Sequence, residues 1–425
     1  MASDVLELAE RLWNGEVEIE SVHPVSLPRT STLAEPAHGV AFVPSFANVS
    51  AVSTGDGLVL VDTGSAPLAA SVKAEIRRWS PERLNTAIYS HGHIDHVFGV
   101  GPYEEEARSM RWPAPVVIAH RGVPERFDRY KLTAGYNSVI NQRQFQLPGF
   151  SWPTEYRYPD RTYDQHLSLD IGGVEVELHH ALGETDDHTW TWVETHRLVC
   201  CGDLFIWASP NAGNPQKVQR YPLEWAAALR QIALKEPEIL LPGHGFPVLG
   251  ADRVATALLD TAELLESLCE QTLTLMNQGA RLDEVLHTVT PPAQLMERPY
   301  LRPIYDDPEF IVHTIWRRYG GWYDGNPSTL KPARESAVAA ELANLAGGAK
   351  VLANRAVALM EAGDLRLAAH LAELAALAAP ADMSVHATRA EVFSKRAMEE
   401  SSTMARGIFA AAAADSKQAM GLTAS

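Results

Sequence analysis

The segment His91-Gly92-His93-Ile94-Asp95-His96 places four metal-binding side chains close together, directly after an apolar stretch. Neutral imidazoles and carboxylates are ligands of zinc and similar first-row ions. A lone histidine is usually a packed or surface residue, but packing does not account for so many polar groups at this spacing. Alternation along the chain places His91 and His93 on one side and leaves Asp95 and His96 free to face a neighbouring site. The segment therefore predicts a metal centre with ligands for two adjacent ions, an arrangement that hydrolases use to make hydroxide at neutral pH.

Three further candidate ligands lie downstream, each where a strand pattern meets a loop. His188 follows an acidic turn and precedes the alternating run HTWTW, Asp203 ends the apolar run RLVCCGD, and His244 lies in PGHG after EILL. Residues at strand ends commonly converge on one rim of a sheet. We therefore expect these residues to complete the metal centre.

The elements that would position these residues can be read along the chain. Residues 38–64 predict short strands with a hairpin at Thr54-Gly55-Asp56-Gly57, and strands are also expected at 85–90, 115–119, 167–207 and 238–241. Residues 66–80, 223–234 and 251–278 have helical spacing. Residues 122–165 have weak periodicity and are interpreted as an irregular insertion over the site, in which Tyr136 is a candidate substrate-binding residue.

These motifs resemble those of the metallo-β-lactamase superfamily, with Asp62 in LVLVDTG as a further matching residue. The resemblance implies a four-layer αββα sandwich with two zinc ions; iron or manganese are the alternatives. One ion would be held by His91, His93 and His188, the other by Asp95, His96 and His244, and Asp203 would bridge them. Asp62 is implied to orient ligands rather than to bind metal, although a turn-capping role is also open.

The later sequence PYLRPIYDDPEFIVHTIWRRYGGWYDGNPSTLKPA resembles the dimerisation segment of the alkylsulfatase branch. Asp307 can cap a helix that starts at Pro308 and ends at Gly320. The nearby aromatic residues suit either a domain core or a surface that packs on a second copy, and the resemblance implies a homodimer. We expect a catalytic domain at 1–250 and an all-α domain at 251–425. Residues 334–416 are rich in Ala, Leu and Glu, and residues 351–380 look like a tetratricopeptide-type helix pair, with too few repeats for a solenoid.

Some positions depart from that branch. Its members usually present glutamates where this chain has His188 and Asp203, and the sterol-carrier-like C-terminal domain of larger members is not found in the sequence. Asn211 lies about where the branch places a sulfate-contacting asparagine, and Arg220 could supply positive charge, although turn and surface roles suit both residues.

Composition limits the classes of partner. The formal net charge of −17 argues against nucleic acid, since phosphate binding depends on cationic side chains. The N-terminal residues predict an amphipathic helix rather than a signal peptide, and no apolar run approaches the roughly 18 residues of a membrane span. We therefore expect a cytoplasmic enzyme with a small-molecule substrate and no membrane association.

The hypothesis from sequence is a binuclear zinc hydrolase of alkyl sulfates or related esters, in which Asp95 orients a metal-bridging hydroxide. A lactone, carboxylic ester or thioester hydrolase is the alternative suggested by the His188 and Asp203 pattern. An iron-dependent oxidoreductase is a further alternative, although His93 stands where a di-iron redox site typically has Glu.

Overall fold

The computed structural model describes residues 4–25 and 32–422. Packing divides the chain into two compact units. The first comprises residues 1–134, 153–280 and 284–320, and the second comprises 135–152, 281–283 and 321–425. These units are defined by packing alone, so the family domains predicted at 1–250 and 251–425 remain a separate prediction.

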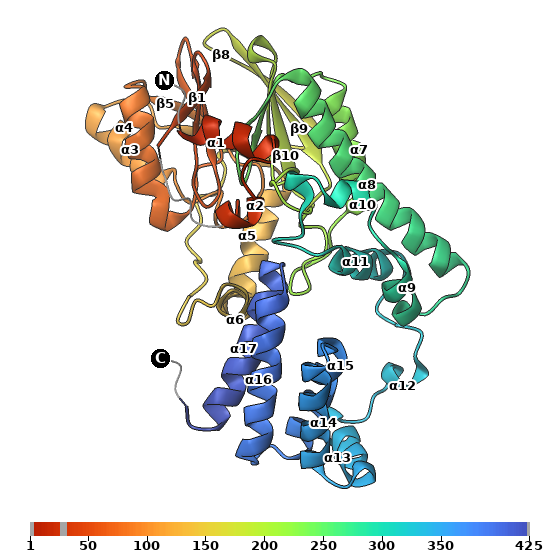
Figure 1. The fold of residues 1–425 in the computed structure, drawn as a ribbon. Coiled ribbons are helices and arrows are strands. Elements are labelled where there is room, and N and C mark those ends of the chain that lie inside the picture. The colour runs from red at the N-terminus through yellow and green to blue at the C-terminus, as the bar shows by residue number, and fades with distance from the viewer. Residues whose placement is uncertain (1–3, 26–31, 423–425) are drawn as a thin grey trace. The chain divides into compact units, whose positions relative to one another are not determined.

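The first unit is built around two mixed sheets that lie side by side (Figure 1). The seven-stranded sheet runs in the order β1 to β7, antiparallel up to β4 and parallel beyond it. Its strands are β1 Ala34–Ala37, β2 Val40–Val43, β3 Val49–Thr54, β4 Gly57–Val61, β5 Leu84–Ile88, β6 Val116–His120 and β7 Arg161–Tyr163. Residues Gly55 and Asp56 connect β3 to β4, so the predicted hairpin is confirmed.

The six-stranded sheet has the order β13-β12-β11-β10-β9-β8 and is antiparallel except between β11 and β12. Its strands are β8 His166–Ile171, β9 Val174–Ala181, β10 His188–Val193, β11 Leu198–Gly202, β12 Ile239–Pro242 and β13 Val248–Leu249. The parallel β11–β12 pair is joined through α7, so the strands that precede Asp203 and His244 end at the same edge of the sheet.

Helices lie against both sheets of the first unit, with α3 and α4 beside the first and α7 and α8 beside the second (Figure 1). The helices of this unit are α1 Asp4–Trp13, α2 Ile19–Val22, α3 Ala69–Trp79, α4 Gly101–Met110, α5 Gly122–Leu132, α7 Pro222–Ala233, α8 Ala251–Asn277, α9 Leu282–Thr288, α10 Ala293–Met296 and α11 Pro308–Gly320. The first residues of α9 belong to the second unit. Short 3-10 turns are η1 Ala66–Leu68, η2 Glu194–His196 and η3 Pro299–Leu301. The predicted αββα sandwich is confirmed, and its first core contains fully buried Leu60, Ile76 and Phe127.

The second unit is helical. Its helices are α6 Ala134–Phe145, which starts at the last residue of the first unit, α12 Pro327–Leu330, α13 Glu335–Ala346, α14 Ala349–Glu361, α15 Leu365–Ala378, α16 Met383–Glu399 and α17 Thr403–Ala419. Helices α14 and α15 pack through small residues such as Ala356, Ala368 and Ala372, and α16 and α17 add Val392, Phe393 and Ala413 to the same core. Of the helices in the described residues, none combines the length and apolar character needed to cross a bilayer.

The interpretation of residues 122–165 as an irregular insertion was wrong for its first half, which forms α5 and α6. The buried face of α6 carries Asn137, Asn141 and Gln144 beside Ile140. Because helix detection by periodicity depends on apolar residues recurring on one face, a helix with a polar buried face gives little signal.

Candidate metal centre

The sequence-predicted ligands converge where strands of the two sheets end. His91, His93, Asp95 and His96 follow β5, Asp203 follows β11, and His244 follows β12. The loops between a strand end and the next element can present several side chains to one point, because the sheet fixes where each loop begins. The expected convergence is therefore seen for six of the seven predicted ligands, with His188 discussed below.

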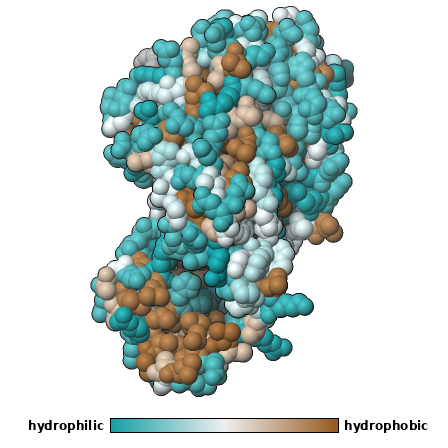
Figure 2. All heavy atoms as spheres, turned by 90° about the vertical axis from the view of Figure 1, so that its right-hand side faces the viewer, coloured by the Kyte–Doolittle hydropathy of each residue, from teal (hydrophilic) through white to brown (hydrophobic). Residues whose placement is uncertain are grey.

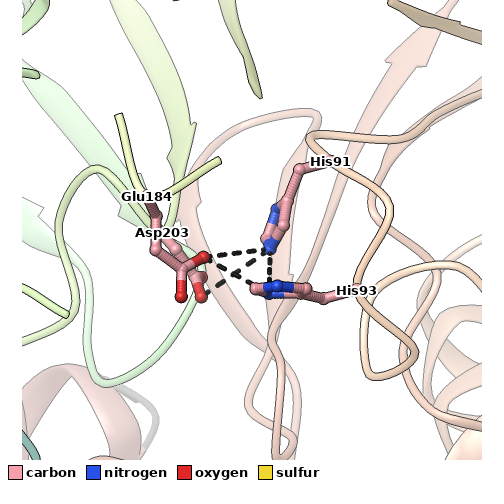
Figure 3. A group of neighbouring side chains, drawn as sticks. All are labelled: His91, His93, Glu184 and Asp203. Carbon is pink, nitrogen blue, oxygen red and sulfur yellow. Dashed lines mark hydrogen bonds and ion pairs between the residues drawn. The ribbon is translucent and has the colours of Figure 1, made fainter. Parts of the chain in front are cut away.

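One group of facing side chains contains His91, His93, Glu184 and Asp203, with the histidines on one side and the carboxylates on the other (Figure 3). Glu184 Oε2 lies 3.3 Å from both His91 Nε2 and His93 Nδ1. Asp203 Oδ2 is 3.9 Å from His91 Nε2. Two ligand atoms that are each about 2.1 Å from one tetrahedral ion lie about 3.4 Å apart, so this spacing suits a shared cation.

A second group contains Asp95, His96 and His244. His244 Nε2 is 3.4 Å from Asp95 Oδ2, and His96 Nε2 is 3.6 Å from the same oxygen. Asp203 also contacts this group, at 3.5 Å from His96 Nε2 and 3.4 Å from His244 Nε2. Asp203 therefore lies between the two groups, as a bridging ligand must.

The donor set and its unsatisfied atoms fit metal ions. His96 Nε2, Glu184 Oε2 and Asp203 Oδ1 are buried without a hydrogen-bond partner in residues 4–25 and 32–422. Buried polar atoms are normally hydrogen-bonded, and a cation in contact with them removes the cost of leaving them unpaired. Imidazole nitrogens and carboxylate oxygens are ligands that zinc accepts.

Opposite charges face each other in the cluster, and a cation that binds the histidines would take the place of their extra protons. Burial opposes protonation of His96, but neighbouring carboxylates, led by Asp203, outweigh it and raise the pKa of His96 well above its ordinary value. Burial would raise the pKa of the Asp203 carboxyl, yet His244 and His96 hold it well below its usual range. His93 and Arg220 do the same for the buried Glu184. The carboxylates are therefore ionised, which is the form that binds a metal.

Asp62 orients two of the residues that follow β5. Its carboxylate accepts hydrogen bonds from Ser90 N and Ser90 Oγ, both at 2.7 Å, and lies 2.7 Å from His96 Nδ1. Contact between a carboxylate and the non-ligating nitrogen of an imidazole fixes the ring orientation and exposes the other nitrogen to the metal. The contacts of Asp62 with Ser90 and His96 are those that a residue orienting metal ligands would make.

His188 lies outside both groups. Its Nε2 is 3.1 Å from the carbonyl oxygen of Cys201, and its ring stacks on His91 with a centroid separation of 4.9 Å. Glu184, four residues earlier in the same acidic turn, occupies the place that the sequence analysis gave to His188. We therefore replace His188 by Glu184 in the ligand set. The available signal was the resemblance itself, since members of the branch usually have a glutamate at this ligand position and the turn after β9 contains one.

The other predicted contact residues have different surroundings. Asn211 Nδ2 donates a hydrogen bond to Glu184 Oε1, and Arg220 Nη2 lies 3.3 Å from the same oxygen. Both side chains are buried and contact Glu184, so they hold its carboxylate in position. Tyr136 lies in α6 of the second unit with 64% of its surface exposed, and its substrate-binding role stays a prediction.

Two groups near the carboxylates were missed as site candidates. Burial, with the added effect of the Glu184 and Asp95 charges, raises the pKa of the Tyr305 phenol well above its ordinary value. Burial and the charge of Arg220 lower the pKa of Lys217 to about 8, while Glu184 and Asp95 act in the opposite direction. Tyr305 lies in the segment that resembles the dimerisation segment, and Lys217 lies in a loop that carries no metal-ligand motif.

Comparison with known proteins agrees with this geometry. Residues 43–244 match the model of the metallo-β-lactamase superfamily. This part of the chain is a metallo-β-lactamase domain. Residues 281–419 match the model of the alkyl sulfatase dimerisation domain, so the chain carries this second domain as well.

The similar curated proteins are alkylsulfatases. A linear primary-alkylsulfatase of Pseudomonas sp. (strain ATCC 19151) is 27% identical, covering 73% of this chain and 62% of its own length. An (R)-specific secondary-alkylsulfatase of Pseudomonas sp. is 24% identical, covering 85% of this chain and 59% of its own. This chain therefore spans about three-fifths of the length of these relatives. The solved structure of the stereoselective inverting sec-alkylsulfatase Pisa1 from Pseudomonas sp. has the same fold, with a TM-score of 0.82, 22% identity, and coverage of 93% of this chain and 66% of that one.

Proposed function

We propose that this protein is a binuclear metal-dependent hydrolase of alkyl sulfate esters, with zinc as the metal. The observation that carries the proposal is the position of Asp203, whose carboxylate contacts His91 in one candidate ligand group and His96 and His244 in the other. A carboxylate with buried histidines on both sides is expected where one residue bridges two cations. The similarity to alkylsulfatases supports the choice of substrate.

The ligand set we propose differs from the sequence-based one in one residue. One ion would be held by His91, His93 and Glu184, the other by Asp95, His96 and His244, and Asp203 would contact both. When bound, the ions would supply a water that ionises near neutral pH and positive charge that stabilises the departing sulfate.

The chain's own residues would orient the reactants. Asp95 is held ionised by His96 and His244, which lower its pKa against the effect of burial, so that it can accept a hydrogen bond from an attacking water. Asn211 and Arg220 would hold Glu184 and border the sulfate position, and Lys217 would add positive charge there. The buried phenol of Tyr305 stays protonated and can donate a hydrogen bond to a sulfate oxygen.

The replacement of His188 by Glu184 also bears on the alternative substrates. A lactone or thioester hydrolase was suggested by histidine at that ligand position. With Glu184 as the ligand, that reason no longer holds, and only Asp203 remains of the two departures from the branch's glutamates.

A substrate panel tests the proposal. Full-length protein is incubated with linear and branched alkyl sulfates, a lactone and a thioester, and released sulfate or acid is measured. We expect sulfate release that a chelator abolishes and added zinc restores. Turnover of the lactone or thioester without alkyl sulfate turnover, or activity that survives complete chelation, would contradict the proposal. Recovery with iron alone would favour the oxidoreductase class.

We also propose that the protein is a homodimer through its helical region. The second unit carries large exposed apolar side chains, including Trp322, Leu345 and Val351, and Figure 2 shows apolar side chains gathered over the helices of this unit. Exposed apolar patches of this kind mark association surfaces. The match to the dimerisation domain makes a second copy of the chain the partner we propose.

A further inference from the structure

A third group of possible metal ligands lies on strands β8 and β9, away from the seven residues of the candidate centre. It contains His166, Glu177 and His179, each of which offers a ligand atom within 4.8 Å of the others. His166 pairs directly with His179 across the two strands. Glu177 precedes His179 by two residues, so all three side chains project from the same face of the sheet.

The geometry of the group is fixed by its neighbours. His179 Nε2 is 2.8 Å from Glu177 Oε2, and His166 Nε2 is 3.9 Å from the same oxygen. The His179 ring stacks on the buried Trp190 at a centroid distance of 3.9 Å and an angle of 9°. Ligands that are already held in place lose little conformational freedom on binding.

We propose that His166, Glu177 and His179 bind a divalent first-row transition-metal ion, such as Zn²⁺ or Cu²⁺. Two imidazoles and one carboxylate suit these ions and are a poor set for Mg²⁺ or Ca²⁺, which prefer oxygen ligands. The His166 side chain is half exposed, so an ion can reach the group from solvent and water can complete its coordination. Since β8 is the last strand of its sheet, the ion would tie this edge strand to β9.

Lys235 competes with the ion for the carboxylate. Its Nζ lies 2.9 Å from Glu177 Oε2, and about one third of the side chain is exposed. A cation that binds Glu177 must displace this ammonium group, which can swing toward solvent on its flexible stem. Removal of the Lys235 charge should therefore strengthen metal binding, whereas loss of either histidine should weaken it.

Calorimetric titration of the full-length protein tests this site. The protein is first equilibrated with zinc and desalted, so that its tightest sites are filled, and is then titrated with Cu²⁺ while tryptophan fluorescence is recorded. We expect one further ion per chain with quenching of fluorescence, because Trp190 lies against His179. His166→Ala and His179→Ala should weaken this event at least about 10-fold, and Lys235→Met should strengthen it.

The control is His370→Ala, which removes an exposed histidine of α15 and should titrate like the wild type. Because His166 is half exposed, its replacement tests the site even if the His179 variant fails to fold. Equal titrations for wild type and His166→Ala, or weaker binding by Lys235→Met, would overturn the proposal. Alkyl sulfate turnover, measured in the same samples, should be unchanged in His166→Ala, so failure of this site can be told apart from failure of the proposed function.

Discussion

At the scale of single residues, the ligand set depends on a choice between Glu184 and His188. Both are buried, but Glu184 faces His91 and His93, whereas His188 faces the Cys201 carbonyl. Sequence reasoning found six of the seven ligands we propose because histidine and aspartate at strand ends are a strong chemical signal. It missed Glu184 because the turn offers several acidic residues, and only the fold shows which one points into the cluster.

This difference gives a direct prediction. Glu184→Gln should lower the metal content of the purified protein by about one ion and reduce kcat/KM more than about 100-fold, since even partners that only orient a ligand are worth 10- to 100-fold. His188→Gln should keep the metal content of the wild type. Elemental analysis with circular dichroism as a check on folding measures both. The reverse pattern, with metal lost only in the His188 variant, would restore the sequence-based assignment.

At the scale of elements, close backbone approaches determine where the ligands lie. A Cβ added at Gly243 in the turn after β12 would stand 2.1 Å from Asp203 Oδ1, so any side chain there must displace the Asp203 carboxylate. The PGHG pattern suggested only that His244 lies in a tight turn. The reason for glycine at position 243 is a contact with a residue forty positions earlier, which no local pattern can reveal.

We therefore predict that Gly243→Ala loses metal and activity although alanine suits its backbone. The matched control is Gly101→Ala at the start of α4, where an added Cβ meets no other atom within 4 Å. Metal content by elemental analysis should fall for Gly243→Ala and stay at the wild-type level for Gly101→Ala. Full metal content in the Gly243 variant would mean that Asp203 can move without consequence and would argue against its bridging role.

Helix α5 is tied to the metal-binding loop through a buried ion pair. Asp187 Oδ2 accepts hydrogen bonds from Arg126 Nε at 2.7 Å and from Gly92 N at 3.1 Å, and neither charged side chain is more than 2% exposed. Removal of one partner from a buried pair costs about 3–5 kcal/mol. Asp187→Ala should lower the free energy of unfolding by up to that amount in urea denaturation, because Arg126 keeps its ion pair with Asp186.

Two further variants make this test specific. Arg126→Met combined with Asp187→Ala should recover part of the loss, because it removes a buried charge that would keep only the half-exposed Asp186 as its partner. Glu266→Gln breaks the exposed pair with Arg230 and should change stability by less than about 1 kcal/mol. A loss of less than about 1 kcal/mol for Asp187→Ala would show that the pair does not hold the loop.

At the scale of the whole molecule, apolar periodicity and turn residues predicted many of the strands and helices locally, whereas the layered sandwich was implied by the resemblance to a known superfamily. Periodicity did not detect α6, whose buried face is polar. It also did not give the limits of the compact units, since α8 packs on the second sheet and α11 packs on α8. Such limits depend on tertiary packing, which a local pattern does not contain.

The proposed dimer gives a prediction at this scale. The wild type should have the mass of two chains in light scattering, and Trp322→Ala, which removes a side chain with 68% of its surface exposed, should shift the protein toward monomer. Leu132→Ala removes a similarly exposed apolar side chain of α5 in the first unit and should leave the mass unchanged. A monomeric wild type would refute the proposed dimer.

The central claim is that two cations occupy the cluster on either side of Asp203. Anomalous scattering from zinc-grown crystals of the full-length protein, recorded at the zinc edge, measures this most directly. The account predicts two peaks in the cluster, one in contact with His91, His93 and Glu184 and the other with Asp95, His96 and His244, both within reach of the Asp203 carboxylate. A single peak there, no peak, or an ion bound by His188 with Glu184 turned away would contradict it.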